Sequence, residues 1–314
     1  MTFFNTYYGE LAALLTAICW TLSAIFYEFA GRKIGSLSVN ILRLGMAFIM
    51  LSIFNLFASG SIVPLNATFF QWFWLAMSGV VGFVIGDLML FQAYVVIGAR
   101  VSMLIMALAP IFAAFTGWLI LGESMNSKSL IGMTVTFIGI AMVVLNRKTE
   151  AGSKGSKFFN LALKQNPTGL LLALGGAFGQ GVGLVLSKYG MKGTGGKLPD
   201  IDPFASSQIR IIAGIIGFSF VFTFLKKWDK LFAATKEHKP MLLTFIGSIF
   251  GPFLGVSFSL LAVAHTSAGI AATLMSIVPV IIIFPSIFVF KEKISLHEIA
   301  GAIVSTIGVA VFFM

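Results

Sequence analysis

The sequence predicts an all-α polytopic membrane protein with ten transmembrane helices, arranged as two inverted five-helix repeats. The first observation is composition: hydrophobic residues make up 58% of the 314 residues, charged residues only 10%, and mean hydropathy is +0.99. Soluble domains carry about 25% charged residues, so 21 basic and 11 acidic side chains cannot cover a water-exposed surface. The second observation is the length of the apolar segments, and the third is an internal repeat.

The first half of the chain contains five apolar segments. A membrane-spanning helix needs about 20 apolar residues. The five predicted helices of this half lie near 9–29, 38–57, 70–94, 99–121 and 128–145. Residues 147–166 are polar and basic, and we expect them to link a first repeat, residues 1–146, to a second.

The second half, residues 167–314, contains five more segments, and helix-start signals precede some of them. Asp202-Pro203 places a capping side chain before a proline in the first helical turn. Ser295 and Glu298 have the spacing of a capping box. The predicted helices of this half lie near 168–188, 204–225, 241–264, 268–290 and 296–313.

An internal repeat relates the two halves. A shift of 169 residues aligns 78–145 with 247–314 without a gap. Prolines, acids and glycines then coincide, among them Pro110 with Pro279, Glu123 with Glu292, Gly82 with Gly251, Gly86 with Gly255, Gly132 with Gly301 and Gly139 with Gly308. A shift of 167 residues pairs Arg43 with Arg210, one arginine inside the membrane in each half.

The odd number of helices in each repeat has a topological consequence. Because five is odd, the second copy enters the membrane from the opposite side, and the halves form an inverted pair. Inverted repeats are typical of secondary transporters, which bind solutes near the membrane midplane between the repeats. The alternative is chance similarity between apolar helices.

Several short motifs resemble one transporter family. Gly86-Asp-Leu-Met-Leu-Phe-Gln-Ala93, Ala109-Pro110 and Leu121-Gly-Glu123, with Trp20 and Arg43 upstream, resemble the first repeat of EamA-type transporters of the drug/metabolite transporter (DMT) superfamily. The resemblance implies a ten-helix transporter of small organic metabolites, often an exporter, that works without ATP hydrolysis. We therefore expect a secondary active transporter that works by alternating access in the cytoplasmic membrane of a bacterium.

The formal net charge of +10 is better explained by topology than by a nucleic-acid partner. Lys and Arg lie almost wholly between the apolar segments, mostly in the loops that follow spans 1, 3, 5, 7 and 9. The positive-inside rule then places these loops in the cytoplasm and both termini outside. The expected partners are a small-molecule solute and membrane lipid, without nucleic acid, and the oligomeric state stays open.

Ionisable side chains inside a span are costly and indicate functional sites. Arg43 and Asp87 lie at similar depth, near the side on which Glu28 closes the first span. We expect a gate or a proton-coupling group there; the alternative is an ion pair that only locks helices together. The acids Asp87, Glu28 and Glu10 could bind a proton during transport, whereas a facilitator would need none.

The second repeat does not copy this arrangement. Arg210 lacks a matching acid, and we expect it to face the other side of the membrane with Lys188 and His265, where Glu10 is the nearest acid. These groups are further gating candidates; the alternative is that the Arg210 side chain extends to the interface.

Polar and aromatic side chains near the middle of the spans are candidates for lining a solute cavity. Trp20 and Gln180 are paired by the repeat and lie near the midpoints of their spans. The alternative is that Trp20 packs and that Gln180 bonds a neighbouring helix. Weaker candidates are Gln92, Tyr94 and Ser257. Pro110 and Pro279 are expected to kink the fourth and ninth spans, because proline removes a backbone hydrogen bond.

Other classes of function are less well supported. No nucleophile–base set or paired mid-membrane acids suggest an embedded enzyme, so we expect no catalytic residue. Cys19 stands alone and the three histidines are scattered, so we expect neither a metal nor a cofactor. A channel or a scaffold remains the main alternative, although no filter sequence is visible.

Overall fold

The computed structural model describes residues 6–146, 167–193, 199–281, 283, 285 and 296–313, and all regular structure in these ranges is helical. The first half contains α2 (Tyr8–Ile34), α3 (Ser36–Ser59), α4 (Phe69–Gly79), the π-helix η1 (Val80–Gly86), α5 (Asp87–Met106), α6 (Ala109–Leu121) and α7 (Ser127–Asn146). The second half contains α9 (Pro167–Lys192), α10 (Pro203–Leu225), α11 (Trp228–Thr235), α12 (His238–Ser248), the π-helix η3 (Ile249–Gly255), α13 (Val256–His265), α14 (Ala268–Met275), α15 (Val278–Ile281), α17 (Leu296–Ala310) and η4 (Val311–Phe313).

In this part of the chain, seven helices are long and apolar enough to cross a membrane. They are Tyr8–Ile34, Ser36–Ser59, Phe69–Leu90, Pro167–Lys192, Pro203–Leu225, His238–His265 and Leu296–Phe313. Shorter apolar helices occupy Ala109–Leu121, Ser127–Met142 and Ala268–Ile281. Each predicted segment overlaps one of these helices, so the chain is a polytopic, all-helical protein. Ten membrane crossings and the inversion stay predictions.

The predicted boundary between the third and fourth segments was wrong. We expected a loop near 95–98, but α5 continues to Met106 and the chain breaks at residues 107–108. The stretch 95–106 contains Arg100 and Ser102 but no proline, so no residue that cannot continue a helix ends it there. Pro110 lies in the first turn of α6, where a missing N–H costs no hydrogen bond. The second half breaks at the repeat-related residues, 276–277, before Pro279.

The helix boundaries follow the repeat found in the sequence. α4 and α12 begin and end 169 residues apart, and so do the seven-residue π-helices η1 and η3. Proline accounts for only one of these π-helices: Pro252 lies in η3, but the related residue in η1 is Phe83. Both π-helices end on the second glycine of a Gly-x3-Gly pair. Asp87 follows directly, as the first residue of α5.

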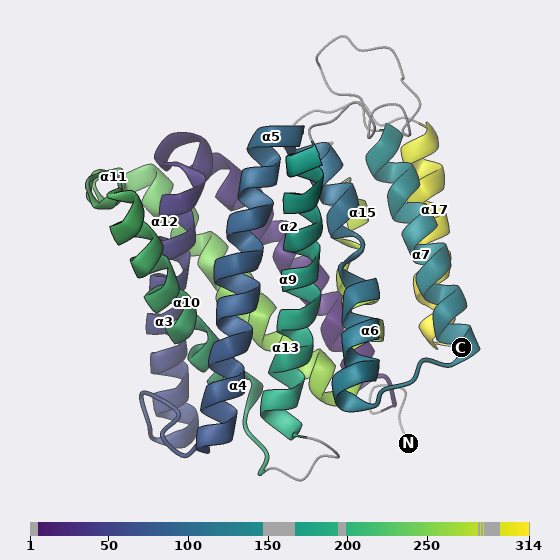
Figure 1. Ribbon diagram of the computed structural model, residues 1–314, viewed down its shortest axis with the longest axis horizontal. Coiled ribbons are helices and arrows are strands. Elements are labelled where there is room, and N and C mark those ends of the chain that lie inside the picture. The colour runs from purple at the N-terminus through teal and green to yellow at the C-terminus, as the bar shows by residue number, and fades with distance from the viewer. Residues whose placement is uncertain are drawn as a thin grey trace.

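The two halves interlock rather than stand side by side (Figure 1). α9 packs on α4, η1 and α5, while α2 packs on α12, η3 and α13; α3 pairs with α10, and α7 with α17. α7 and α17 are repeat-related helices that pack against each other, so the repeat relates the two sides of their contact. A Cβ atom added at Gly139 would collide with the backbone of Ser305, and one added at Gly308 would collide with that of Thr136. Both Thr136/Ser305 and Gly139/Gly308 are repeat pairs, so the same small-residue contact occurs twice.

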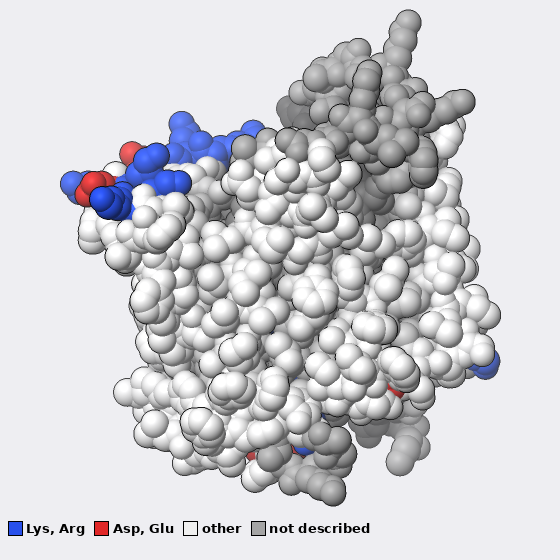
Figure 2. Space-filling model, in the orientation of Figure 1, with Lys and Arg blue, Asp and Glu red and all other residues white. Residues whose placement is uncertain are grey.

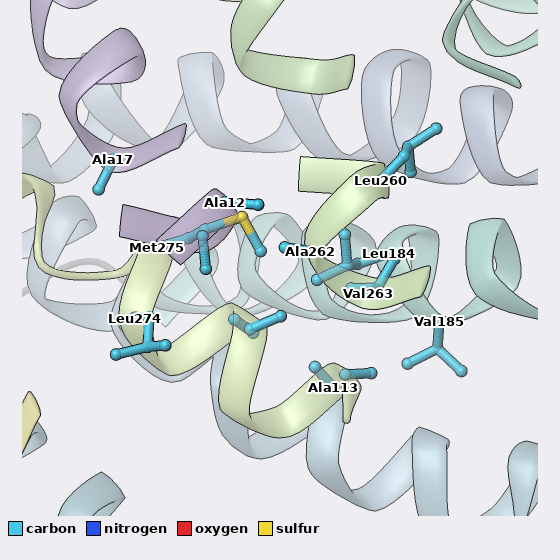
Figure 3. Close-up of a cluster of buried hydrophobic side chains, with 14 of the residues drawn as sticks. Ala12, Ala17, Ala113, Leu184, Val185, Leu260, Ala262, Val263, Leu274 and Met275 are labelled. Carbon is cyan, nitrogen blue, oxygen red and sulfur yellow. The ribbon is translucent and has the colours of Figure 1, made fainter. Parts of the chain in front are cut away.

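The largest buried apolar cluster lies between α2, α6, α9, α13 and α14 (Figure 3). Alanines predominate on its α2 side, where Ala12, Ala13 and Ala17 are at most 6% exposed. Small side chains let helix backbones approach closely, and close approach is the main source of helix association in lipid. This packing holds α2 and α9 in the interior, where they carry the polar groups described below.

Basic side chains are concentrated at one end of the molecule (Figure 2). Basic side chains gather over α11 at the upper left of Figure 2, and α17 ends at the opposite face. The two ends of the described chain meet there, because the Tyr7 hydroxyl donates a hydrogen bond of 2.9 Å to the backbone oxygen of Phe313.

Asp202 caps α10 as expected, accepting from the Phe204 and Ala205 amides at 2.8 and 3.2 Å. The segment expected to be a polar loop after α10 instead contains the short helix α11.

Candidate functional site

Asp87 forms a buried ion pair with Arg43. Asp87 is 6% exposed, and its Oδ2 lies 2.5 Å from Nη2 of Arg43 on α3. The guanidinium carbon of Arg43 also lies 5.6 Å from the centroid of the Tyr27 ring on α2. The pair therefore joins α5 to α3 and places the arginine against α2, all within the first half of the chain.

Gln180 brings the second half of the chain to the same carboxylate. Its Nε2 donates to Oδ1 of Asp87 at 2.9 Å and to the backbone oxygen of Gly82 at 3.2 Å. Glycines make this approach possible: a Cβ added at Gly179 would lie 2.9 Å from the Gly86 Cα. A one-carbon side chain there would separate α9 from η1. Both Asp87 oxygens thus have a partner, one from each half.

Arg210 also lies near Asp87, which corrects the expectation that it faces the other side without an acid. The residue is 5% exposed, its guanidinium carbon is 4.9 Å from the Phe83 ring centroid, and it interacts electrostatically with Asp87. Its backbone oxygen lies against Gly79, so the side chain extends along η1 toward Asp87. Counting residues along a span gives the depth of a Cα atom, whereas a long arginine side chain carries its charge well away from it.

A second polar cluster joins four elements. The Lys188 Nζ on α9 lies 2.5 Å from Oε1 of Glu123 and donates to the Thr266 backbone oxygen at 2.6 Å. The Thr266 hydroxyl donates to Oε1 of Glu10 on α2 at 2.8 Å. Oε2 of Glu123 accepts from the Ala268 amide at 2.8 Å, so this carboxylate caps the start of α14.

From the sequence, Glu123 was recognised only as the repeat mate of Glu292, and its ion pair with Lys188 was not predicted. Gly122 ends α6 with a φ of +67°, a conformation that favours glycine, and the Glu123 amide then donates back to the Gly117 oxygen at 3.2 Å. This turn directs the acid toward Lys188. The available signal was the glycine directly before the acid.

The pattern of the EamA-like transporter family matches residues 7–145 and, a second time, residues 167–314. The chain belongs to the EamA-like transporter family. The match confirms the resemblance seen in the motifs and covers both halves. This chain thus belongs to a family of membrane transporters, and its long apolar helices are those of an integral membrane protein.

Individual proteins also resemble this EamA chain. An uncharacterized transporter, YoaV of Bacillus subtilis (strain 168), is 26% identical over 136 residues, which are 43% of this chain and 46% of that protein. The aligned region thus spans less than half the length of that relative. A solved crystal structure superposes with a TM-score of 0.71 over 97% of this chain and 96% of the other, at 16% identity, which shows a shared fold.

The remaining predicted site residues of this EamA chain are dispersed. Trp20 is half-buried and packs on Gly255, where an added Cβ would lie 2.7 Å from the indole nitrogen. Ser257 is fully buried and its hydroxyl has no hydrogen-bond partner among the described residues, whereas Gln92 is exposed. His265 is exposed and meets the Tyr8 ring edge-on at 5.0 Å. The side chains of Glu28 and Tyr94 and the whole of Glu292 lie outside the described part of the chain.

Proposed function

We propose that this chain is a secondary active transporter that moves small organic metabolites out of the cell across the cytoplasmic membrane by alternating access. The observation that carries the proposal is the repetition of helix boundaries, π-helices and helix breaks at a spacing of 169 residues. Two halves of like backbone are able to exchange roles, so that one conformation opens to one side and its counterpart opens to the other.

The two polar clusters are suited to act as gates. Gln180 and Lys188 are eight residues apart on α9, which corresponds to about 12 Å along the helix. Each binds an acid on another element: Gln180 binds Asp87, and Lys188 binds Glu123. A solute that passes between the halves requires one set of contacts to open while the other holds. In this mechanism Asp87 is also the acid that takes up a proton, and a facilitator would not need that step.

Counterflow in proteoliposomes tests the proposal. Vesicles that contain the purified chain are loaded with an unlabelled candidate solute and diluted into the labelled solute at low concentration. A carrier exchanges the two and transiently accumulates label against its gradient. A channel gives flux only down the gradient, and an enzyme would convert the solute. Either of those results would replace the transporter proposal.

The proposed orientation has both termini outside the cell and the α11 face in the cytoplasm. It is supported by the basic residues over α11, because positive loops are retained in the cytoplasm. The chain ends lie on the opposite face, where Tyr7 contacts Phe313.

A further inference from the structure

A cavity of about 220 Å³ lies between the start of α3, the end of α10 and α11, at the end of the molecule where basic side chains gather (Figure 2). A water molecule takes up about 30 Å³ in the liquid, so the cavity has room for a larger polar group. Four polar residues line it: Ser36 and Ser38 in the first turn of α3, Lys227 just before α11, and Lys230 on α11. The fold thus brings groups from two distant parts of the chain to one space.

Neither lysine has an acidic partner among the described residues. Lys227 is half-buried and Lys230 is exposed, and no side-chain hydrogen bond or ion pair within the described part of the chain involves either of them. Asp229 is the acid of α11, but residues one or two apart do not lie on the same side of a helix. Both ammonium groups are therefore available to an anion in the cavity.

The first turn of α3 adds uncharged donors. Gly35 precedes α3 as its N-cap and offers no side chain to the free N–H groups of that turn. Ser38 is 4% exposed and lines the cavity, and its hydroxyl forms no hydrogen bond within the described ranges. Thr16 and Ser187, by contrast, each donate to the backbone oxygen four residues earlier, at 2.9 and 2.7 Å. The buried Ser38 hydroxyl therefore remains available to a ligand.

The turn between α10 and α11 fixes the position of Lys227. Lys226 ends α10 with a φ of +52°, and the Lys227 amide donates to the Phe222 oxygen at 3.1 Å. The Trp228 indole donates to the Thr223 hydroxyl at 3.1 Å, and its ring centroid lies 5.6 Å from that of Phe222. The backbone that carries this lysine is thus part of a packed corner of the fold.

The cavity lies at the depth of lipid headgroups. The apolar span of α10 ends at Leu225, two residues before Lys227. Next to the cavity-lining residues, Phe224 on α10 is 87% exposed and Phe232 on α11 is 61% exposed. Aromatic side chains are enriched where a membrane meets water, with their apolar part against the hydrocarbon. A ligand in the cavity is therefore a neighbour of acyl chains.

A phosphate group matches this set of donors. Its oxygens accept hydrogen bonds from ammonium groups, from hydroxyls and from the free N–H groups of a helix start. Basic pockets beside membrane-spanning helices bind phospholipid headgroups in the same way. An anionic headgroup is favoured over a zwitterionic one, because the ammonium group of the latter would approach the two lysines.

We propose that Ser36, Ser38, Lys227 and Lys230 bind the phosphate of an anionic phospholipid, whose acyl chains lie against the exposed aromatic side chains of α10 and α11. The bound lipid joins α3 of the first half to α10 and α11 of the second. Lipid binding at this cavity is independent of the solute, direction and coupling of transport.

Thermal unfolding of the purified full-length chain in uncharged detergent micelles tests the proposal. The micelles contain a rising fraction of phosphatidylglycerol or, as the neutral counterpart, phosphatidylcholine. A ligand of the folded state raises the melting temperature in proportion to its affinity. We expect phosphatidylglycerol to do so in a saturable way, and phosphatidylcholine to require roughly tenfold more lipid for the same effect. Millimolar inorganic phosphate without lipid separates a free anion from a lipid, and we expect it to have no effect.

Paired substitutions identify the site. Lys227→Gln with Lys230→Gln is expected to raise the amount of phosphatidylglycerol needed for half the effect roughly thirtyfold, because each lysine near the membrane surface contributes roughly fivefold. Lys236→Gln with Lys239→Gln is the matched control, since it removes the same charge from exposed side chains outside the cavity. Its effect should stay below about threefold, because salt screens exposed charges.

Ser38→Ala tests the hydroxyl without a change of charge, and it should weaken binding by about tenfold. The melting temperatures of the lipid-free variants report whether each one folds.

Several results would overturn the inference. Equal stabilisation by both lipids would exclude an anionic headgroup, and an equal effect of inorganic phosphate alone would assign the cavity to a free anion. Equal losses in the two paired lysine variants would mean a general attraction of the surface for anionic lipid. A wild-type response in both Lys227→Gln with Lys230→Gln and Ser38→Ala would place the lipid elsewhere.

Discussion

Arg43 and Arg210 are related by the internal repeat, and the side chains of both extend toward Asp87. Arg43 contacts it directly at 2.5 Å, whereas Arg210 interacts with it electrostatically from its position over Phe83. The position that corresponds to Asp87 in the second half is Val256, so the second half supplies an arginine but no matching acid. The repeat therefore conserves the arginine in both halves but the acid in only one, and the charged residues of the two halves are not equivalent.

Asp87→Asn is expected to abolish dependence of transport on a pH gradient while the chain still folds. Asparagine keeps the shape and an oxygen for Gln180 but cannot carry the proton. The measurement is uptake into proteoliposomes with and without a pH gradient, with size-exclusion chromatography as the check of folding. Asp229→Asn, an exposed acid on α11, is the matched control. Undiminished proton-driven uptake in Asp87→Asn would remove this residue from coupling.

Gly139→Ala is expected to destabilise the chain by about 2 kcal/mol, because the new methyl group would overlap the Ser305 backbone where α7 crosses α17. Gly45→Ala on α3 is the control, since an added Cβ there meets nothing within 4 Å. It should be neutral or stabilising by about 0.5 kcal/mol. Melting temperatures in detergent compare the two, and equal values would contradict the close α7–α17 contact.

Glu123→Gln and Lys188→Met are each expected to destabilise the chain by about 2 kcal/mol, because each leaves a largely buried charged partner unpaired. The double variant should lose less than the sum, with an interaction energy of about 1 kcal/mol or more. A double-mutant cycle on melting temperature or denaturant unfolding measures this. Additive single effects would mean that the two side chains do not interact.

Reporter fusions at residue 314 test the orientation. With the C-terminus outside, alkaline phosphatase fused there is active and green fluorescent protein is dark, because the former folds outside the cytoplasm and the latter inside it. The opposite pair of signals would invert the orientation and place the α11 lysines outside.

Much of the fold was predictable from local patterns. Apolar length located the helices, and the repeat anticipated that α12 would match α4, although not that both would continue into a π-helix. The helix break before Pro110 was misplaced by about ten residues, because proline marks where a helix restarts rather than where the previous one must end.

The sequence by itself determined that this chain is a membrane protein, that it belongs to the EamA-like transporter family, and that Arg43 and Arg210 occupy related positions in the two repeats. These properties depend on residue identity and spacing, which are local. Only the tertiary structure decided that Arg210 reaches toward Asp87, that Gln180 binds it, and that Glu123 pairs with Lys188. Those contacts depend on how closely the glycine faces of α9 and η1 approach, and on the direction of long side chains, which only packing sets.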